Sequence, residues 1–569
     1  MTDQAPPREP FWWLRASAWL VASAIGILGF HVIAGTASEL LIPQDGVQVI
    51  RETELAFYAW YCAFGVLCAL LVCGAASELG VGPRLVALCT RLGERPERCV
   101  LAASAAMFVG SLVFRLLALD RQAITDDEAT YVFIARTLLA GRLLNPPPEE
   151  PDFFRNQFVV LNDHAWYGKY PIGHPLWLAL GEALHLRDVM GPLAGALCVA
   201  LTYQVGCRFG SRQRAALGAV LLCASPHFVA TCATLLSQPT SCLALLLGCW
   251  LLLRAQERTS VLDAALAGAV FGFGILVRPL PGVLFAAVGG MVFVAFAVRT
   301  QRSAWSERWL ALALFSAAGL AVAGLLLLVN HAQTGGYLRT GYHEVHPNMA
   351  LFGTAQTIAN SLFGALLREN FWLLGVPLSL LPLVFWRAER QRALWLGLLC
   401  TTVAYRVIAP KTMVCSTGPV YLTEIVPLLT LAVADSLCRS APLARTAQLS
   451  AAGLTVAAAL FWPVQMQTLR TGVEARGLVY EGLAHSQADR GLVFADALVY
   501  PPTNVTWAYF PDNPSPDLND RFVFVRIPKA DSLRQMQNFW KRRFPDRRAF
   551  VFTWGPNGEP LFRELPEHD

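Results

Sequence analysis

The sequence has few charged residues and very few lysines. Only 15% of its 569 residues are charged, whereas a soluble globular protein has roughly 25%. Hydrophobic residues make up 55% of the chain, and the mean hydropathy is +0.45. This composition excludes an ordinary soluble domain and predicts an integral membrane protein with membrane lipids around it. The net charge of +5 is small, so no nucleic-acid partner is expected.

A disulfide framework is also missing. The 14 cysteines lie mostly within or beside apolar segments, and none follows residue 464. Small exported domains that depend on disulfides are rich in paired cysteines, so this fold is not expected to depend on oxidation. Repeats of fixed period are absent as well, and the sequence "NPPPEEP" at 145–151 is the one short biased spacer.

Long apolar segments recur from near the N-terminus to about residue 464. A helix needs about 20 largely apolar residues to cross the hydrocarbon core, and on that basis we count about 13 spans. Their approximate centres are Ile25, Cys62, Phe108, Leu197, Leu222, Leu246, Phe271, Gly290, Gly319, Leu380, Leu399, Leu428 and Ala457. The fold class predicted is therefore a polytopic α-helical membrane protein with a membrane domain over residues 1–464. The first span lacks a clear cleavage site after it and is interpreted as a retained anchor.

Arginine placement predicts the orientation of these spans. Arginines cluster in every second connection, within residues 84–98, 208–214, 254–258, 299–308, 387–392 and 439–445. Positive loops stay on the cytoplasmic side, so the N-terminus is expected in the cytoplasm and the C-terminus in the periplasm. Three long segments then lie outside, namely 120–188, 331–370 and 465–569. The last contains three strand-like segments and a helix-like one, which predicts a small periplasmic α/β domain.

One outer segment begins with three consecutive acids in "AITDDEATYVFIARTLLAGR", residues 123–142. Thr125 can cap a helix here, and Glu128 three residues later completes a capping box. Acids in a first helical turn also complement the helix dipole, which is the purely structural interpretation. However, capping needs only one or two acids, and Asp126 and Asp127 add charge at the edge of lipid, where an ionised group is costly without a function.

A second motif follows about 40 residues later. The sequence "WYGKYPIGHPLWLALG" at 166–181 places Lys169, Tyr170 and His174 just before the next span. With the Asp-Glu-x-x-Tyr pattern at 127–131, it resembles the GT-C glycosyltransferases, in the branch of the protein O-mannosyltransferases and aminoarabinose transferases. Further similar stretches are "CASPHFVATCATLLSQPTS" at 223–241, "LAGAVFGFGILVRP" at 266–279, "GGYLRTGY" at 335–342 and "GPVYLTEIVPLL" at 418–429.

The resemblance implies transfer of a sugar from a polyprenyl phosphate, which serves as the donor substrate. It places the catalytic aspartate on Asp127, with Glu128 and Asp126 as supporting acids. Transfer from a lipid phosphate also needs cations that stabilise the departing phosphate. The candidates are Lys169 and Arg278, then Arg339 and Lys411, although basic side chains at these positions can also be interfacial anchors. Residues expected to contact the substrates are Tyr131, Tyr170, His174, Gln238, Tyr342, Tyr421 and Glu424.

The sequence departs from the family pattern at two positions. Gln238 stands where relatives commonly carry an acid or a histidine, and an amide cannot act as a base. A second acid would then be Glu344 or Asp163, between which the sequence does not decide. Val420 stands where relatives tend to have arginine. His343 and His346 have metal-ligand spacing with Glu344, but no metal is expected.

Two other classes of protein have similar compositions. A transporter or lipid flippase would also have many spans, and a non-catalytic scaffold in envelope glycan assembly would need no acid and lysine pair. Convergence of Asp127, Lys169 and Arg278 on one outward-facing cavity would favour the enzyme, and their dispersal would favour either of the other classes. The acceptor stays open among protein, lipid and envelope glycan, as does the sugar, and the expected location is a bacterial inner membrane.

Overall fold

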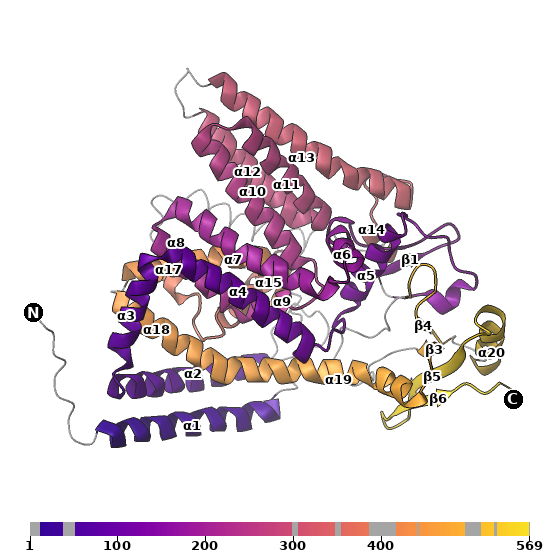
Figure 1. The fold of residues 1–569 in the computed structure, drawn as a ribbon, viewed down its shortest axis with the longest axis horizontal. Coiled ribbons are helices and arrows are strands. Elements are labelled where there is room, and N and C mark those ends of the chain that lie inside the picture. The colour runs from indigo at the N-terminus through magenta and orange to yellow at the C-terminus, as the bar shows by residue number, and fades with distance from the viewer. Residues whose placement is uncertain are drawn as a thin grey trace, which may run out of the picture.

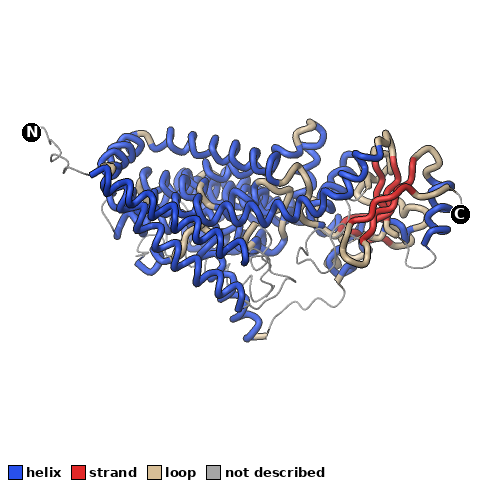
Figure 2. The backbone as a smooth tube through the Cα atoms, turned by 90° about the horizontal axis from the view of Figure 1, so that it is seen from below, coloured by secondary structure: helices blue, strands red, loops and turns tan. Residues whose placement is uncertain are grey.

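The computed structural model describes residues 12–37, 52–156, 158–298, 305–346, 354–385, 417–440, 443–495, 514–527 and 532–567. Most of these residues are helical, and the helices form an elongated bundle with a small sheet at one end (Figures 1 and 2). In chain order, the first half contains α1 (Trp12–Ala37), α2 (Glu52–Glu78), α3 (Val81–Glu94), α4 (Pro96–Val113), α5 (Asp126–Leu139), α6 (Gly173–Ala183), α7 (Met190–Phe209), α8 (Arg212–Cys223), α9 (Pro226–Cys232) and α10 (Gln238–Arg258).

The second half continues this helical pattern up to the C-terminal sheet. It contains α11 (Val261–Val277), α12 (Pro279–Val298), α13 (Trp305–Thr334), α14 (Gly341–Val345), α15 (Ala355–Trp372), the 3₁₀ helix η7 (Val420–Ile425), α17 (Val426–Ser440), α18 (Leu443–Val456) and α19 (Trp462–Ser486). Helices α10 to α13 form a group that projects to one side of the bundle (Figure 1).

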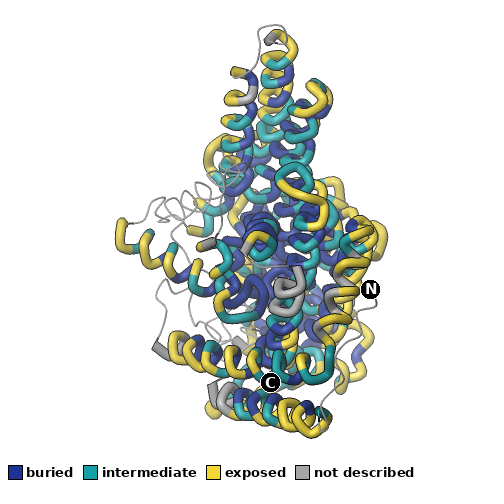
Figure 3. The backbone as a smooth tube through the Cα atoms, turned by 90° about the vertical axis from the view of Figure 1, so that its left-hand side faces the viewer, coloured by how far each residue is buried: buried dark blue, intermediate teal, exposed yellow. Residues whose placement is uncertain are grey.

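Seven helices in the described residues are long and apolar enough to cross a membrane, and α8 with α9 forms an eighth if this bent pair is one span. The chain is therefore a multi-pass membrane protein. The two helices of the pair meet at 61°, at a break that precedes Pro226. Helices α11 and α12 are apolar but shorter. Because lipid replaces water around such a bundle, large apolar side chains remain exposed, as Leu117 and Leu320 do at 76% and 73%. Exposed positions lie along the outer helices (Figure 3).

The predicted number of about 13 spans is not reproduced among the described residues. Around Leu380, where a span was predicted, the chain forms turns and the 3₁₀ helix η6 (Leu381–Phe385). The causes are local, because Gly375 has a φ of 65° and two prolines, Pro377 and Pro382, follow it. The predicted span at Leu399 lies outside the described residues.

Small residues allow the helices of the projecting group to pack closely. A Cβ atom on Gly268 of α11 would overlap the carbonyl group of Phe315 in α13, so only glycine permits this approach. Such contacts between small residues and a facing backbone are a common way for helices to associate in lipid, where there is no hydrophobic driving force between them.

The C-terminal residues form a four-stranded sheet in the order β4-β3-β5-β6, with β3 (Gly491–Ala495), β4 (Phe522–Val525), β5 (Arg548–Trp554) and β6 (Pro560–Glu564). The first three strands are parallel and β6 is antiparallel to β5. Helix α20 (Ser532–Arg543) connects β4 to β5. Three strands (β3, β4 and β5) and helix α20 correspond to the three strand-like segments and the helix-like segment of the sequence, whereas β6 was not predicted. We call residues 491–564 the C-terminal sheet unit. The predicted boundary after residue 464 falls within the first turn of α19.

Several short elements gather beside this sheet unit. They are α5, α6, α14 and the two-stranded antiparallel ribbon of β1 (Val159–Leu161) and β2 (Trp166–Gly168) (Figure 1). They come from the segments 120–188 and 331–370, so the acidic motif at 123–142 and the lysine motif at 166–181 are at this end of the bundle.

Candidate active site

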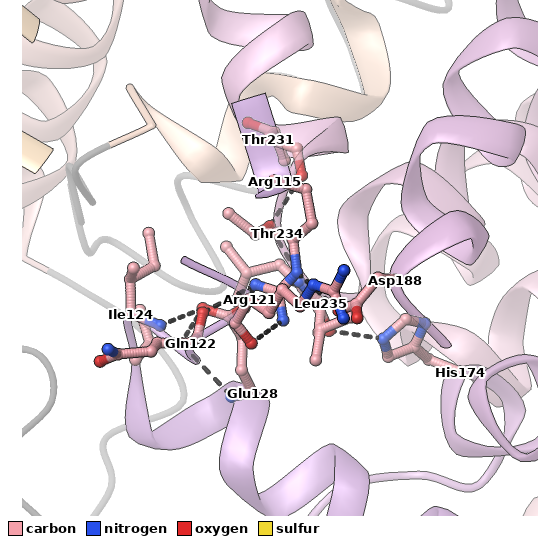
Figure 4. A network of polar contacts seen from close by, with 12 residues as sticks. Arg115, Arg121, Gln122, Ile124, Glu128, His174, Asp188, Thr231, Thr234 and Leu235 are labelled. Atoms are coloured by element: carbon pink, nitrogen blue, oxygen red, sulfur yellow. Dashed lines mark hydrogen bonds and ion pairs between the residues drawn. The ribbon is translucent and has the colours of Figure 1, made fainter. Parts of the chain in front are cut away.

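Helix α5 begins at the predicted capping residue, but the reciprocal bond of a capping box goes to the amide of Ile124 and not to that of Thr125. Thr125 has extended φ and ψ angles, and its hydroxyl accepts a hydrogen bond from the Glu128 amide at 3.3 Å. The Glu128 carboxylate accepts in turn from the Ile124 amide at 3.0 Å. Its other oxygen accepts from the Leu235 amide at 2.8 Å, which ties α5 to the segment before α10 (Figure 4). Both oxygens of Glu128 are therefore bound by backbone donors.

Glu128 is fully buried, and burial raises the pKa of its carboxyl group while the nearby Arg115 guanidinium acts in the opposite direction. Arg115 lies 3.9 Å from the carboxylate and makes an ion pair of 2.9 Å with Asp188. It also donates to the carbonyl groups of Gln122 and Arg121, at 2.7 and 2.6 Å. Arg115 thus fixes the turn that leads into α5. The sequence interpretation missed this residue, although a lone arginine in an apolar run was a usable signal.

Asp127, the predicted base, has a different environment. It is partly exposed, while its neighbour Asp126 is buried. The phenol of Tyr170 donates a short hydrogen bond to the Asp127 carboxylate. Burial, together with the charge of Asp127, raises the pKa of Tyr170 well above its usual value, so the phenol remains protonated and continues to donate. The Tyr170 ring lies 4.5 Å from that of Tyr131, measured between centroids.

A chain of polar contacts links Tyr131 to the predicted phosphate ligand Arg278. The Tyr131 hydroxyl is 3.0 Å from the hydroxyl of Ser237, and Arg278 donates to the same oxygen at 3.3 Å. Arg278 also forms an ion pair with Glu424, at 2.7 Å, and lies 5.7 Å from the ring of Tyr421. Ser237 was not among the predicted residues, although it lies in the quoted "SQPTS" stretch.

Lys169 is buried among aromatic rings on the other side of Tyr170. Its ammonium nitrogen is 3.3 Å from the ring centroid of Phe158 and 4.9 Å from that of Tyr170. Tyr342 lies at 5.2 Å, and the Nε2 atom of His346 at 3.4 Å. The structure therefore brings Lys169, Tyr170 and Tyr342 together, although they come from two motifs far apart in the sequence.

Two glycines allow these elements to approach one another. A Cβ atom on Gly341 would lie 2.6 Å from the Cα atom of Lys169, so the first residue of α14 packs directly on the lysine backbone. A Cβ atom on Gly173 would lie 2.6 Å from the amide nitrogen of Val277, which precedes Arg278. A larger residue at position 341 would push α14 away from Lys169. A larger residue at position 173 would push the start of α6 away from the segment that carries Arg278.

His174 and Gln238 lie deeper in the same region. The Nε2 atom of His174 donates to the Leu235 carbonyl at 2.8 Å, which leaves Nδ1 to accept from the Thr240 hydroxyl at 3.0 Å. Burial lowers the pKa of His174 to about 4, so the ring is neutral. Gln238 is buried at the start of α10, and its amide oxygen has no hydrogen-bond partner among the described residues.

The remaining candidates lie elsewhere. Arg339 is 60% exposed and forms an ion pair of 2.5 Å with Glu344, one of the two alternatives for a second acid. The other alternative, Asp163, is exposed. His343 bonds through Nδ1 to Thr340 in the cap of α14. Lys411 lies outside the described residues. Within the described part of the chain, no group of three or more histidine, cysteine or acidic residues is placed to hold a metal ion.

The chain is similar to proteins of known family and structure. Residues 188–326 match the model of the family described as dolichyl-phosphate-mannose-protein mannosyltransferase. The structure is similar to that of apo ArnT from Cupriavidus metallidurans, with a TM-score of 0.51 and 14% identity over 80% of this chain and 93% of that one. The same protein bound to undecaprenyl phosphate gives a TM-score of 0.51 and 15% identity over the same shares.

A weaker similarity is to the arabinosyltransferase EmbB from Mycobacterium smegmatis, with a TM-score of 0.39 and 16% identity over 69% of this chain and 35% of that one. No curated protein matches the sequence. At these identities the match to ArnT concerns the fold. The chain has the fold of ArnT. The match of residues 188–326 confirms the resemblance to the mannosyltransferase family that the motifs indicated.

Proposed function

We propose that the chain is an integral-membrane glycosyltransferase that transfers a sugar from a polyprenyl-phosphate donor to an envelope acceptor at the outer face of the membrane. The observation that supports it most is the convergence of one carboxylate and two cations. Tyr170 donates to Asp127 and its ring lies 4.9 Å from the Lys169 ammonium, while Tyr131, beside it, is linked through Ser237 to Arg278.

The proposed reaction uses these groups as follows. A hydroxyl or amine of the acceptor gives its proton to Asp127 while its electron pair forms a bond to the anomeric carbon of the donor sugar. The bond from that carbon to the phosphate oxygen breaks, and its electrons remain on the phosphate. Lys169 and Arg278 stabilise the negative charge that develops there. Tyr170 orients the Asp127 carboxylate, and Glu128 holds the helix that presents it.

The rival functions lack comparable support. A transporter would place its functional acids near mid-membrane, whereas Asp127 begins a helix beside the C-terminal sheet unit. A scaffold would not need a buried lysine near a carboxylate, because burying an ammonium is costly unless it has a function. Undecaprenyl phosphate, the ligand named for one ArnT structure, is the donor carrier that we propose here. No metal ion is part of the mechanism that we propose.

The proposed setting is a bacterial inner membrane with the N-terminus in the cytoplasm. Residues 1–464 would form the membrane domain and 465–569 a periplasmic domain, which places Asp127 on the periplasmic side. A reporter fused after Asp569 is expected to behave as exported, and one inserted within residues 84–98 as cytoplasmic. A C-terminus found in the cytoplasm would put the site on the wrong side for an exported lipid-linked donor.

The function is tested by mass spectrometry of envelope lipids and glycans from a deletion strain. We expect one sugar modification to disappear, to return with the wild-type gene, and to stay absent with the Asp127→Asn variant expressed at equal level. This comparison would also identify the sugar and the acceptor. An unchanged set of envelope lipids, glycans and glycoproteins would count against the proposal.

A further inference from the structure

Phe158 adopts a backbone conformation that is unusual for its side chain. Its φ is 66°, in the left-handed region that bulky residues rarely enter. Such a conformation costs free energy and persists only where the surrounding structure enforces it. The Phe158 carbonyl accepts from the Lys169 amide at 3.0 Å, and the Phe158 ring lies under the Lys169 ammonium at 3.3 Å. The strained residue therefore contacts both the backbone and the charge of Lys169.

The C-terminal sheet unit holds the segment that leads to Phe158. The Arg526 amide, just after β4, donates to the Phe153 carbonyl at 2.8 Å. The ring of Phe153 stacks on that of Phe539 in α20, with centroids 4.0 Å apart. Arg542, also in α20, forms an ion pair of 2.9 Å with Glu150. These contacts fix residues 150–153 on the sheet unit, five residues before Phe158.

We propose that Phe158 is a positioning residue for Lys169, and that the C-terminal sheet unit keeps Phe158 in place. The inference rests on the proposed function, in which Lys169 binds the donor phosphate. An aromatic face attracts an ammonium strongly in a dry site but carries no net charge, so it orients the ammonium without cancelling the charge that a phosphate needs. The sheet unit thereby gains a role in donor binding although it lies outside the helical bundle.

The test compares binding of undecaprenyl phosphate with binding of undecaprenol, which has the same chain but no phosphate. Full-length protein in lipid nanodiscs is used for each variant, with thermal stability measured in parallel. Phe158→Leu is expected to weaken binding of undecaprenyl phosphate about 10-fold and to leave binding of undecaprenol unchanged. Phe158→Tyr keeps a ring face and is expected to bind like wild type. Phe363→Leu, at a position 64% exposed, is the control for loss of a phenylalanine elsewhere.

A double-mutant cycle separates positioning from a general effect on shape. In the Lys169→Ala background, Phe158→Leu is expected to have no further effect on phosphate binding, because the residue it positions is gone. Equal and additive losses would overturn the inference, as would equal weakening of both lipids. If Lys169→Ala weakens binding and Phe158→Leu does not, the inference fails while the proposed function stands. If Lys169→Ala has no effect, both the inference and the phosphate role of Lys169 fail.

The support from the sheet unit is tested with a matched pair of variants. Phe153→Leu removes the stack on Phe539, whereas Phe562→Leu removes a stack on Phe550 within the same sheet, with centroids 5.2 Å apart. Phe153→Leu is expected to weaken binding of undecaprenyl phosphate several-fold, with undecaprenol unaffected. Phe562→Leu is expected to leave both unchanged. Equal effects of the two variants would show that the unit does not act through residues 153–158.

Discussion

Two adjacent carboxylates at the start of α5 have opposite environments. Glu128 is fully buried, and backbone amides of Ile124 and Leu235 bind its two oxygens while Arg115 lies close by. Asp127 is partly exposed, and the side chain that donates to it among the described residues is the Tyr170 phenol. A carboxylate bound by fixed backbone donors is suited to holding structure, because its lone pairs are already used.

Asp127, in contrast, is partly exposed and accepts from a side chain. The ring of its partner Tyr170 lies 4.9 Å from the Lys169 ammonium. Changes at Asp127 and at Lys169 should therefore affect the same reaction. Changes at Glu128 should affect the presentation of the helix. Acids in the same helical turn can therefore have separate roles, and the following substitutions test that separation.

The largest effect is expected for Asp127→Asn. The substitution keeps the size of the side chain and its ability to accept from Tyr170, yet it removes basicity. Turnover should fall by roughly 10²- to 10⁴-fold, the loss typical of a positioned general base, while insertion and thermal stability stay near wild type. The measurement is sugar transfer by purified protein from the donor identified in the deletion strain. Wild-type activity in this variant would leave α5 with a capping role only.

The second largest loss of activity is expected for Lys169→Ala. Loss of the ammonium removes a stabilising charge from the departing phosphate, and kcat/KM should fall by about 10²-fold. Lys169→Arg should recover part of the activity, because it restores the positive charge in a different shape. Steady-state kinetics over a range of donor concentrations would measure both. If Lys169→Ala were as active as wild type, the phosphate role would pass to Arg278.

Glu128→Gln should reduce stability more than chemistry. The amide has one acceptor oxygen in place of two, so the backbone amide of Ile124 or Leu235 would face an NH₂ group and lose its partner. An unsatisfied buried donor costs about 1–3 kcal/mol, which predicts a lower melting temperature. Folded protein measured at low temperature should retain far more activity than Asp127→Asn. A loss of turnover equal to that of Asp127→Asn, with unchanged melting, would instead give Glu128 a catalytic role.

Much of this arrangement was accessible from the sequence because its signals are local. The start of α5 depends on Thr125 and Glu128, three residues apart, and β3, β4 and β5 lie in short segments rich in valine and phenylalanine. Apolar runs located most spans, but the run around Leu380 was misinterpreted because hydropathy ignores the turn formed at Gly375 and Pro377.

The partners of the site residues could not be predicted in the same way. Ser237 links Tyr131 to Arg278, and Phe158 lies against Lys169, through contacts that depend on how distant segments pack. The hydrophobic periodicity of a sequence does not predict such contacts. Glu424 was recognised as costly within an apolar segment, but its pairing with Arg278, 146 positions earlier in the chain, required the structure.

The smallest effect is expected for His174, whose neutral ring lies edge-on to that of Tyr131, with centroids 4.7 Å apart. Burial lowers its pKa to about 4 in the folded protein, whereas the unfolded chain binds a proton near pH 6.5. Between these values the unfolded state holds more protons, so stability rises with pH through this window and is lost as pH falls from 6.5 toward 4. We therefore expect the melting temperature of wild type to drop between pH 7 and pH 5 by more than that of His174→Asn, which has no titrating ring. Equal pH dependence in the two proteins would mean that burial does not keep the ring of His174 neutral in the folded state.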